Sequence, residues 1–447
     1  MTTPIADFIE NYIKNDMSRL HMPGHKGTLY SEDITEVKGA DALYEADGII
    51  AKSEQNATKI FGTKQTLYST EGSSQCIKAM LMLALNNREN KSERPLVLAA
   101  RNVHKAFISA AALIDFDVKW LMPKTTDSLC KCIISKEQLK ETLENSAKKP
   151  NAVYITSPDY LGNIADIREL SEVCKEFDIP LLVDNAHGAY LKFLGNHPID
   201  LGADMCCDSA HKTLPVLTGG AYLHINNENY LQNAKEFLSI FGSTSPSYLI
   251  LSSLDKANKY MAESFADDLN KTIEKLKELL VYITNQSDEE IKLTIDAKDY
   301  SLSGFELAEI LRKNKIECEY ADEKFLVLMV SPFNSENDFL RLKNALKTLK
   351  KAPKTLENGS KSVKNGSKTD ENDVVFSKIE QKMSIREAYF SPQKEIAIEQ
   401  SEGEICGIVT VSCPPAIPIA LAGEKITQNH IKLFKKYGIK TIKVVAK

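Results

Sequence analysis

The chain has 447 residues, of which 43% are hydrophobic and 26% charged, with a formal net charge of −5. This balance is typical of a globular protein of two or three domains and argues against binding of nucleic acid through net positive charge. No apolar run approaches the roughly 20 residues that span a bilayer, and the N-terminus lacks a secretory pattern. The nine cysteines are odd in number and form no CxxC pair. We therefore expect a cytoplasmic protein with reduced thiols, without membrane or nucleic-acid partners.

The elements predicted in chain order divide the chain into five segments. An N-terminal segment covers 1–60. In 61–285, short β-rich runs alternate with helical patterns, and apolar strands separated by helices predict a mainly parallel sheet covered on both faces. A smaller α+β unit follows at 286–350, then a flexible linker rich in Lys, Ser and Asn at 351–375, and a C-terminal unit at 376–447.

The large segment contains five predicted strands and ends in a long helical run. In an open parallel sheet, ligands bind at the carboxyl ends of the strands. Four groups of polar or reactive residues lie at predicted strand or helix ends. The strands are expected at 95–100, 151–158, 180–186, 204–210 and 220–225, and helices at 167–177 and 247–285.

The first group, Gly72, Ser73 and Ser74, opens an apolar helix in the sequence STEGSSQCIKAMLMLAL. Free backbone N–H groups and the helix dipole favour a phosphate there, although the residues by themselves are better explained as an ordinary serine N-cap. The second group is ARNVHKAF. Its His104 can stack on a flat ligand, but a single histidine at a strand end is more often structural.

The third group lies in LLVDNAHGAY, where Asp184 follows a run of apolar residues. A buried carboxylate needs a cationic or hydrogen-bonding partner, and a protonated ring nitrogen of a cofactor is such a partner. Ala186 is small enough to lie under a ring, and His187 can hydrogen-bond nearby. Because a metal needs more ligands at short spacing than His187 provides, we expect no metal here.

The fourth group is the sequence DSAHKTLPVLTGG, in which Lys212 lies between a histidine and a threonine. Ser209 and His211 flank the lysine closely enough to bind an anion beside it. A lysine desolvated near other cationic groups loses its proton more easily and becomes a nucleophile toward a carbonyl. A phosphate site, a stacking ring, a carboxylate for a ring nitrogen and an amine for an aldehyde together describe one cofactor, pyridoxal phosphate.

With these motifs the chain resembles the Orn/Lys/Arg decarboxylases, fold-type-I pyridoxal-phosphate enzymes, in the short form without an N-terminal wing domain. The resemblance runs nearly end to end. It implies an α/β fold of the aspartate-aminotransferase type, smaller α+β units toward the C-terminus, and a homodimer or larger homo-oligomer with active sites at the subunit interface. The matching sequences are HMPGHKG, DITEV, RNVHK, VDNAHGAY, SAHKTLP, STSPSYLILSSLD, MSIREAYF and PPAIP.

The resemblance implies a role for each candidate residue. Lys212 would form the Schiff base with the cofactor, and Asp184 would hold the pyridinium nitrogen. His104 would stack on the ring, Ala186 would lie against the opposite face, and His187 would lie near the phenolate oxygen. The residues expected to bind the phosphate are Ser73, Ser74, Ser209 and His211.

Two further implications concern the shared site. Ser247 and Tyr248, in the SPSY sequence, would approach the cofactor of the second subunit. The C-terminal motif, in the family usually a tyrosine, two prolines and a glycine, here has Cys413 before the prolines and Ala416 after them, and a common upstream glutamate corresponds to Ile408. Since this region helps to form the substrate side of the site, these departures bear on substrate identity more than on reaction type.

The resemblance implies decarboxylation of a basic L-amino acid, with arginine slightly favoured over lysine or ornithine, giving a polyamine or its precursor. An aminotransferase or lyase is the alternative within the same fold, with Arg386 as a candidate clamp for a second carboxylate. A non-catalytic relative that acts by binding a partner is the alternative from another class. Carboxylates would recognise the distal cation of the substrate, and the candidates are Asp33, Glu36, Glu45, Asp47, Glu402 and Glu404.

Overall fold

The computed structural model describes the chain except for residues 89–90, 124–125, 350–378, 409, 412–415 and 447. The linker expected at 351–375 therefore lies outside the described residues. Within the described part, no helix combines the length and the apolarity that a membrane span requires.

A seven-stranded sheet forms the centre of the large segment, in the order β1-β7-β6-β5-β4-β2-β3. The strand β7 runs antiparallel to both of its neighbours, and the remaining pairings are parallel. The expected mainly parallel sheet is thus confirmed. Its strands are β1 (Gln65–Ser69), β2 (Leu96–Ala100), β3 (Asp117–Leu121), β4 (Ala152–Thr156), β5 (Leu181–Asp184), β6 (Met205–Asp208) and β7 (Ala221–Ile225).

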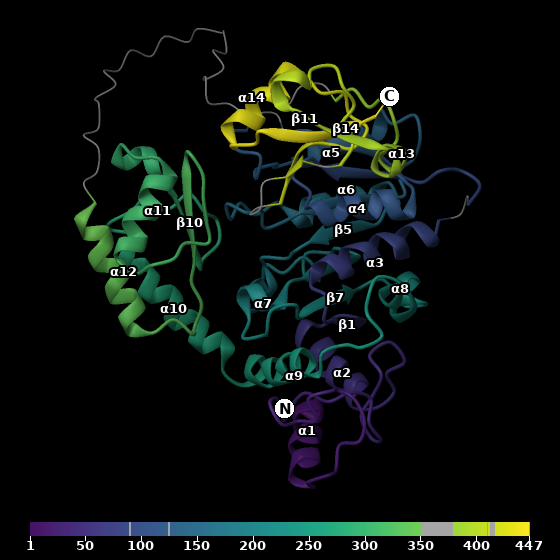
Figure 1. Cartoon of the computed structure of the whole chain (residues 1–447), viewed down its shortest axis with the longest axis vertical. Helices are drawn as coiled ribbons and strands as arrows, with labels where there is room; N and C mark the ends of the chain where they lie inside the picture. The colour runs from purple at the N-terminus through teal and green to yellow at the C-terminus, as the bar shows by residue number, and fades with distance from the viewer. Residues whose placement is uncertain (89–90, 124–125, 350–378, 409, 412–415, 447) are drawn as a thin grey trace.

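Helices cover both faces of this sheet (Figure 1). One core cluster joins one face of the strands to α3 (Ser73–Asn86), α4 (Lys105–Ile114) and α8 (Ala234–Ile240). A second core cluster joins the other face to α5 (Lys136–Glu144) and α6 (Ile167–Glu176). Successive strand residues alternate between the two clusters, because side chains in a strand point to opposite faces.

The long helical run expected at 247–285 is two helices, α9 (Tyr248–Glu263) and α10 (Phe265–Leu279). Ser264 separates them with φ −142° and ψ −21°, outside the helical range. Two aspartates follow in the first turn of α10, where they complement the positive end of the helix dipole. The helix α9 packs against α1 (Pro4–Lys14) and α2 (Ile49–Phe61) of the N-terminal segment.

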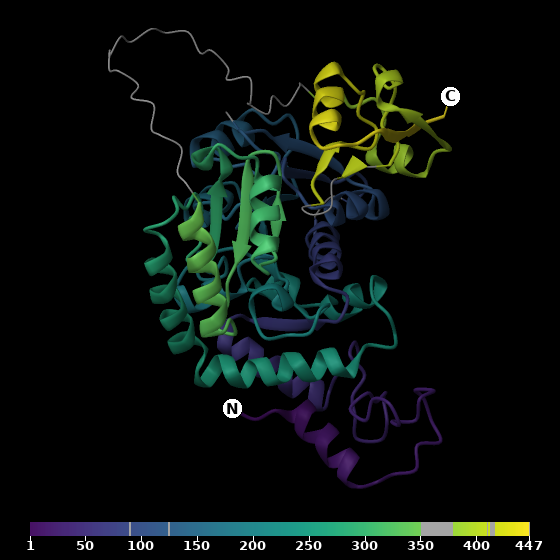
Figure 2. The same ribbon diagram turned by 60° about the vertical axis from the view of Figure 1, so that its left-hand side comes forward.

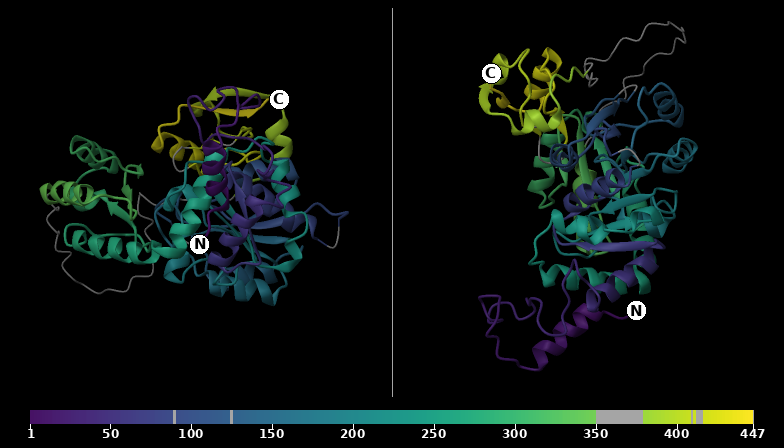
Figure 3. Two further views of the ribbon diagram at one scale, coloured as in Figure 1. Left: turned by 90° about the horizontal axis from the view of Figure 1, so that it is seen from below. Right: turned by 90° about the vertical axis from the view of Figure 1, so that its right-hand side faces the viewer.

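Two smaller units follow the sheet (Figures 2 and 3). The first has a three-stranded antiparallel sheet in the order β8-β10-β9, and the second has two two-stranded sheets, β11-β14 and β12-β13. The division of the chain into five segments remains our proposal. The elements of the first unit are β8 (Lys292–Asp296), α11 (Gly304–Lys313), β9 (Tyr320–Ala321), β10 (Phe325–Met329) and α12 (Glu336–Thr348). Those of the second are α13 (Ile385–Phe390), β11 (Gln393–Ala397), β12 (Thr410–Val411), β13 (Pro418–Ala420), α14 (Gln428–Lys436) and β14 (Thr441–Val445).

Short helical turns complete the described fold. They include α7 (Ala210–Thr213), which follows β6 directly, and the 3-10 turns η1 (Ala189–Leu194), η2 (Glu228–Tyr230), η3 (Ala297–Tyr300) and η4 (Ile398–Gln400). The position of α7 matters most here, since it carries Lys212 away from the carboxyl end of a buried strand.

Candidate active site

A cavity of about 200 Å³ opens at the carboxyl edge of the large sheet. The ends of β2, β4, β5 and β6 all lead into it, which is where the topology of an open α/β sheet places ligands. It brings together six of the residues predicted as cofactor ligands with residues from the C-terminal unit. The lining residues are Ser73, Asn102, His104, Cys130, Thr156, Pro158, Tyr160, Asp184, Ala186, His187, Lys212, Ala416 and Ile417.

Lys212 projects from α7 into this cavity, with its Nζ 2.9 Å from Nε2 of His187. The side chain keeps accessible surface because the cavity is open, but protein atoms crowd the ammonium. The resulting desolvation lowers the pKa of Lys212, while the carboxylates of Asp184 and Glu319 oppose the shift. An amine with a lowered pKa is the form that can attack a carbonyl carbon.

Asp184 ends β5 and is 2% exposed. Burial raises the pKa of its carboxyl group, and the charge of Lys212 acts most strongly against this rise. Tyr154 donates to Oδ2 at 3.1 Å, and the backbone N–H of Ala186 donates to Oδ1 at 3.2 Å. The carboxylate is therefore held in place by neutral donors and can still gain from a cationic partner in the cavity.

His104 combines a structural and a cavity-facing position. Its Nδ1 accepts from the backbone N–H of Ala106 at 3.2 Å, so the ring caps the N-terminus of α4. Burial and the nearby charge of Lys212 lower the pKa of His104 to about 4, which keeps the ring neutral near pH 7. A neutral, fixed ring can stack on a flat ligand, and Ala186 lines the same cavity.

The start of α3 offers donors for an anion. Gly72 is the N-cap residue, with φ +70°, and no side chain caps the first N–H groups of the helix. Ser209 donates through its hydroxyl to that of Ser73 at 2.8 Å, which joins the end of β6 to this helix start. His211 lies close by in sequence, but its Nδ1 meets the carbonyl oxygen of Gly220 at 3.0 Å. Ser74, Ser209 and His211 do not line the cavity itself.

Three buried polar atoms of the cavity wall have no hydrogen-bond partner: Oδ1 of Asn102, Oγ1 of Thr156 and Nδ1 of His187. Leaving such groups unpaired costs about 1–3 kcal/mol each. Since the pKa of His187 is well below its ordinary value through burial, Nε2 can accept from Lys212 and the ring proton then lies on Nδ1. The cavity thus presents unpaired donors and acceptors beside an amine and a carboxylate, which fits a polar ring such as that of pyridoxal phosphate.

Sequence reasoning did not assign roles to Asn102, Thr156 or Tyr160. Asn102 lies inside the quoted RNVHK motif, and Thr156 ends β4, so the rule that ligands bind at strand ends could have found both. The ring of Tyr160 packs edge-on against His187, with centroids 4.9 Å apart, and its hydroxyl donates to Glu319. Glu319 belongs to the small α+β unit, and nothing local in the sequence indicates that it meets a residue of the cavity wall.

The C-terminal unit closes part of the cavity wall with Ala416 and Ile417. Ala416 has φ +60°, a left-handed conformation that favours the glycine usual in the family. Its carbonyl oxygen accepts from the backbone N–H of Lys105 at 3.0 Å. Ile408 is 38% exposed and does not line the cavity, and Cys413 lies outside the described residues.

The six carboxylates proposed from the sequence for the substrate cation do not line this cavity. Asp33 meets His25 at 3.0 Å and Glu402 accepts from Gln428, each at another place in the fold. Arg386, the candidate clamp for an aminotransferase, donates to the backbone carbonyls of Ala112 and Leu113 and is also absent from the cavity. Within one chain, the carboxylates that act most strongly on the pKa of Lys212 are those of Asp184 and Glu319.

Tyr248 is fully buried, which corrects the expectation that it approaches a second subunit. Its hydroxyl donates to the carbonyl oxygen of Asp41 and accepts from the backbone N–H of the same residue at 3.0 Å. The aromatic ring therefore packs inside its own chain, where it joins the start of α9 to the N-terminal segment. Ser247, the residue before it, is only partly buried.

A second polar cluster surrounds Asp208, the last residue of β6. The Nε2 atoms of His197 and His224 meet its Oδ2 at 3.1 and 3.0 Å, and Asn185 donates to Oδ1 at 2.6 Å. With Cys206 these side chains could surround a metal ion. Metal ligation by Nε2 would place a proton on Nδ1 of His197, which has no acceptor. We therefore interpret the cluster as a hydrogen-bond network that joins the ends of β5 and β6.

Comparisons with known proteins agree with this geometry. A family model described as the major domain of the Orn/Lys/Arg decarboxylases matches residues 3–296. An arginine decarboxylase of Bacillus subtilis (strain 168) is 26% identical over 474 residues, covering 97% of this chain and 93% of that protein. An uncharacterized protein of the same organism, YaaO, is 28% identical over 477 residues, covering 99% and 95%.

The fold is shared with the crystal structure of the Francisella novicida lysine decarboxylase LdcF. The TM-score is 0.79 at 18% identity, over 99% of this chain and 81% of that one. This likeness confirms the expected α/β fold. Because the family match spans most of the chain, the protein belongs to the Orn/Lys/Arg decarboxylase family and is a pyridoxal-phosphate-dependent decarboxylase.

Proposed function

We propose that this protein removes the α-carboxyl group of a basic L-amino acid, with arginine preferred over lysine and ornithine, and so makes a polyamine or its precursor. The observation that carries the proposal is the amine of Lys212 at 2.9 Å from His187, in one cavity with Asp184 and His104. The arginine preference is supported by the Bacillus relative named as an arginine decarboxylase.

The residues of the cavity suit pyridoxal phosphate. Bound there, this cofactor supplies an aldehyde for an amine and an electron-poor ring that takes up the electron pair left when CO₂ departs. Asp184 would keep a proton on the ring nitrogen, because a buried carboxylate favours an adjacent cation. Ser73, with the uncapped N–H groups that begin α3, would bind the phosphate, assisted by Ser74, Ser209 and His211.

Other residues of the chain would orient the reacting groups. His104 and Ala186 would hold the ring between them, and Nδ1 of His187 would donate to its oxygen. Lys212, whose pKa is lowered by burial, would supply the unprotonated amine and later return a proton to the α-carbon. Asn102 and Thr156 provide the remaining unpaired groups of the wall and would also contact the ligand.

We assign recognition of the distal cation to Glu319. Its carboxylate accepts from Tyr160, which lines the cavity, and its charge is felt by Lys212. A carboxylate that meets the cavity wall and acts on the reacting amine through its charge suits a cation at the far end of the substrate side chain. The absence of Arg386 from the cavity speaks against the alternative of an aminotransferase for dicarboxylic substrates.

We also propose a homodimer, in which a second copy of the chain covers the N-terminal segment. This segment extends away from the sheet (Figure 2), and a monomer gains nothing from exposing so many large apolar side chains close together. A cytoplasmic location remains a prediction from the sequence. The exposed side chains of the segment are Met17, Leu20, Met22, Leu29 and Tyr30.

The test is release of CO₂ by the cofactor-loaded protein from L-arginine, L-lysine, L-ornithine and L-citrulline. Citrulline has nearly the shape of arginine without its charge, so it isolates recognition of the cation. We expect turnover of arginine at least tenfold above that of lysine and ornithine, and none of citrulline. Equal turnover of citrulline would overturn the basic substrate, and formation of a keto acid without CO₂ would favour an aminotransferase.

A further inference from the structure

Two arginines connect the C-terminal unit to the large segment, and each donates to two successive backbone carbonyls on the other side. Arg101, directly after β2, donates through Nη1 to Pro418 at 2.9 Å and through Nη2 to Ile419 at 3.0 Å. Arg386, on α13, donates to Ala112 at 2.8 Å and to the next carbonyl at 3.1 Å. Figure 1 shows this C-terminal unit, in yellow, beside α4.

The two arginines differ in what lies next to them. Arg101 is 1% exposed and begins the turn that carries the cavity residues Asn102 and His104. The strand that it holds, β13, directly follows the cavity residues Ala416 and Ile417. Arg386 instead meets the far end of α4 and is absent from the cavity.

The part of the cavity wall beside Arg101, formed by Ala416 and Ile417, needs hydrogen bonds that fix its backbone. Ala416 has φ +60°, and a residue in this sparsely populated conformation keeps it only when its surroundings impose it. The backbone N–H of Lys105 holds its carbonyl oxygen at 3.0 Å, and the guanidinium holds the following strand. The planar fork of arginine matches two neighbouring carbonyls, whereas the ammonium of lysine acts as a point charge.

Nearby groups favour the charged guanidinium at this position. Burial lowers the pKa of Arg101, and the charge of Glu424, in the same C-terminal unit, acts against that decrease. Glu424 is itself buried and accepts from the backbone N–H of Leu421 at 3.0 Å. The ring of Trp120 lies 5.6 Å from the guanidinium carbon, within the range of a cation–π contact.

We propose that Arg101 is a positioning residue for the decarboxylation: its guanidinium holds the wall of Ala416 and Ile417 against the turn of Asn102 and His104. Substrate binding then depends on docking of the C-terminal unit at this point. The kinetic part of this inference rests on the proposed function, whereas the restraint of the backbone does not.

The experiment compares Arg101→Lys and Arg101→Met with the matched control Arg386→Met in the full-length, cofactor-loaded protein. Hydrogen exchange measured without substrate should increase at least tenfold for the backbone amides of residue 417 and of 419–421 in both Arg101 variants; residue 418 is a proline and has no amide hydrogen. In Arg386→Met the increase should occur near α13 instead. Unchanged exchange at 417–421 in Arg101→Lys would overturn the proposal, whatever the enzyme's substrate.

Kinetics on the accepted substrate provide the second measurement. We expect KM to rise at least tenfold in Arg101→Lys with kcat within about threefold of the wild type, and the cofactor absorbance to be kept. Arg386→Met should change KM less than twofold. If KM rose equally in Arg101→Lys and in Arg386→Met, Arg101 would only stabilise the interface between the C-terminal unit and the large segment. If no substrate is turned over by the wild type, the proposed function fails while the exchange result still decides the restraint.

Discussion

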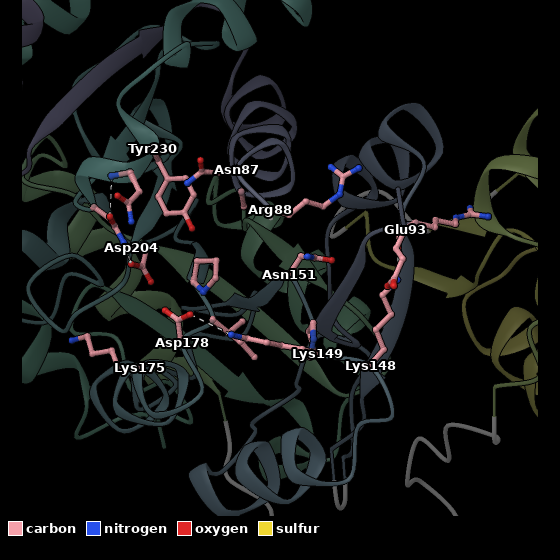
Figure 4. Close-up of a pocket in the computed structure, with 17 residues that line it drawn as sticks. Asn87, Arg88, Glu93, Lys148, Lys149, Asn151, Lys175, Asp178, Asp204 and Tyr230 are labelled. Atoms are coloured by element: carbon pink, nitrogen blue, oxygen red, sulfur yellow. Dashed lines mark hydrogen bonds and ion pairs between the residues drawn. The ribbon is translucent and has the colours of Figure 1, made fainter. Parts of the chain in front are cut away.

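The two edges of the large sheet carry hollows that differ in size and in chemistry. At the amino edge, a hollow of about 870 Å³ is lined partly by charged side chains, some of which form solvent-exposed ion pairs. Figure 4 shows the pair of Lys149 and Asp178. Nζ of Lys149 and Oδ2 of Asp178 are 3.3 Å apart, and both side chains are largely exposed. At the carboxyl edge, the cavity of about 200 Å³ holds Lys212 and Asp184, whose pKa values burial shifts in opposite directions.

The comparison teaches that volume does not identify the reactive site. An exposed ion pair contributes about 0–1 kcal/mol, because water screens it. Nε of Arg88, in the larger hollow, also lacks a hydrogen-bond partner. The smaller cavity has three such buried atoms, on Asn102, Thr156 and His187, beside an amine and a carboxylate, so their cost lies where a ligand could remove it. Unpaired buried groups beside an amine and a carboxylate with shifted pKa values therefore indicate the site better than the volume of a hollow does.

The largest effect is expected from Lys212→Ala. Loss of the reacting amine should reduce kcat at least about 10³-fold. The absorbance of the covalently held cofactor should disappear, while noncovalent binding through the phosphate residues persists. Borohydride reduction followed by peptide mass spectrometry measures the linkage directly. A cofactor label elsewhere than on Lys212, with activity retained, would contradict the assignment.

Asp184→Asn should lower kcat by roughly 10²–10³-fold with KM little changed, because the charge that it provides matters most as electron density moves into the ring. The variant should keep its fold, since Oδ1 of asparagine can still accept from Ala186 and its Nδ2 can donate to the hydroxyl oxygen of Tyr154. Steady-state kinetics together with the cofactor absorbance test this. A normal kcat would remove Asp184 from the reaction.

His104 makes stability of the cofactor-free protein depend on pH. Its pKa is about 4 when folded and about 6.5 in an unfolded chain, so between these values the unfolded state binds more protons. Stability should therefore decrease as the pH falls from 6.5 to 4, by roughly 3 kcal/mol at most. Denaturant titrations should show a smaller decrease in His104→Asn, where asparagine still caps α4. An identical pH dependence in both proteins would be the contrary result.

Glu319→Gln tests whether the carboxyl-edge cavity extends to the small α+β unit. KM for arginine should rise about tenfold, the equivalent of about 1.4 kcal/mol, with kcat within about threefold. Because the charge of Glu319 raises the pKa of Lys212, the amine of Lys212 should also titrate at lower pH in the variant. Glu323→Gln, in the same unit, is a control expected to leave KM unchanged. Equal KM values for wild type and Glu319→Gln would exclude Glu319 from substrate recognition.

The smallest effect is expected at the amino edge. Lys149→Ala should change activity less than twofold and stability by about 0.5 kcal/mol or less, since its ion pair is exposed. Thermal unfolding and the standard assay suffice as measurements. A tenfold loss of activity would give the larger hollow a part in the reaction and break the comparison between the two edges.

Much of the site could be predicted because its residues follow strands that are recognisable locally. Asp184 follows four apolar residues, and Lys212 lies shortly after another buried strand, so the parallel topology was enough to bring them to one edge. The carboxylates proposed for the substrate were misplaced for the opposite reason. Asp33 and Glu402 lie in segments without such periodicity, so no strand end marks where their side chains are placed.

By itself, the sequence predicted which side chains would supply an amine, a carboxylate and a stacking ring, and that the sheet would gather them at one edge, where the structure has them in one cavity. These features follow from local hydrophobic patterns, which mark the strands, and from the parallel topology, which places the ends of the strands at one edge. Only the tertiary structure decided that Glu319 meets Tyr160 of the cavity wall, that Tyr248 is buried in its own chain, and that Arg101 binds the strand after the C-terminal wall. Such contacts join residues 159 to 317 positions apart in the chain, and they depend on how separate units pack, which no local pattern encodes.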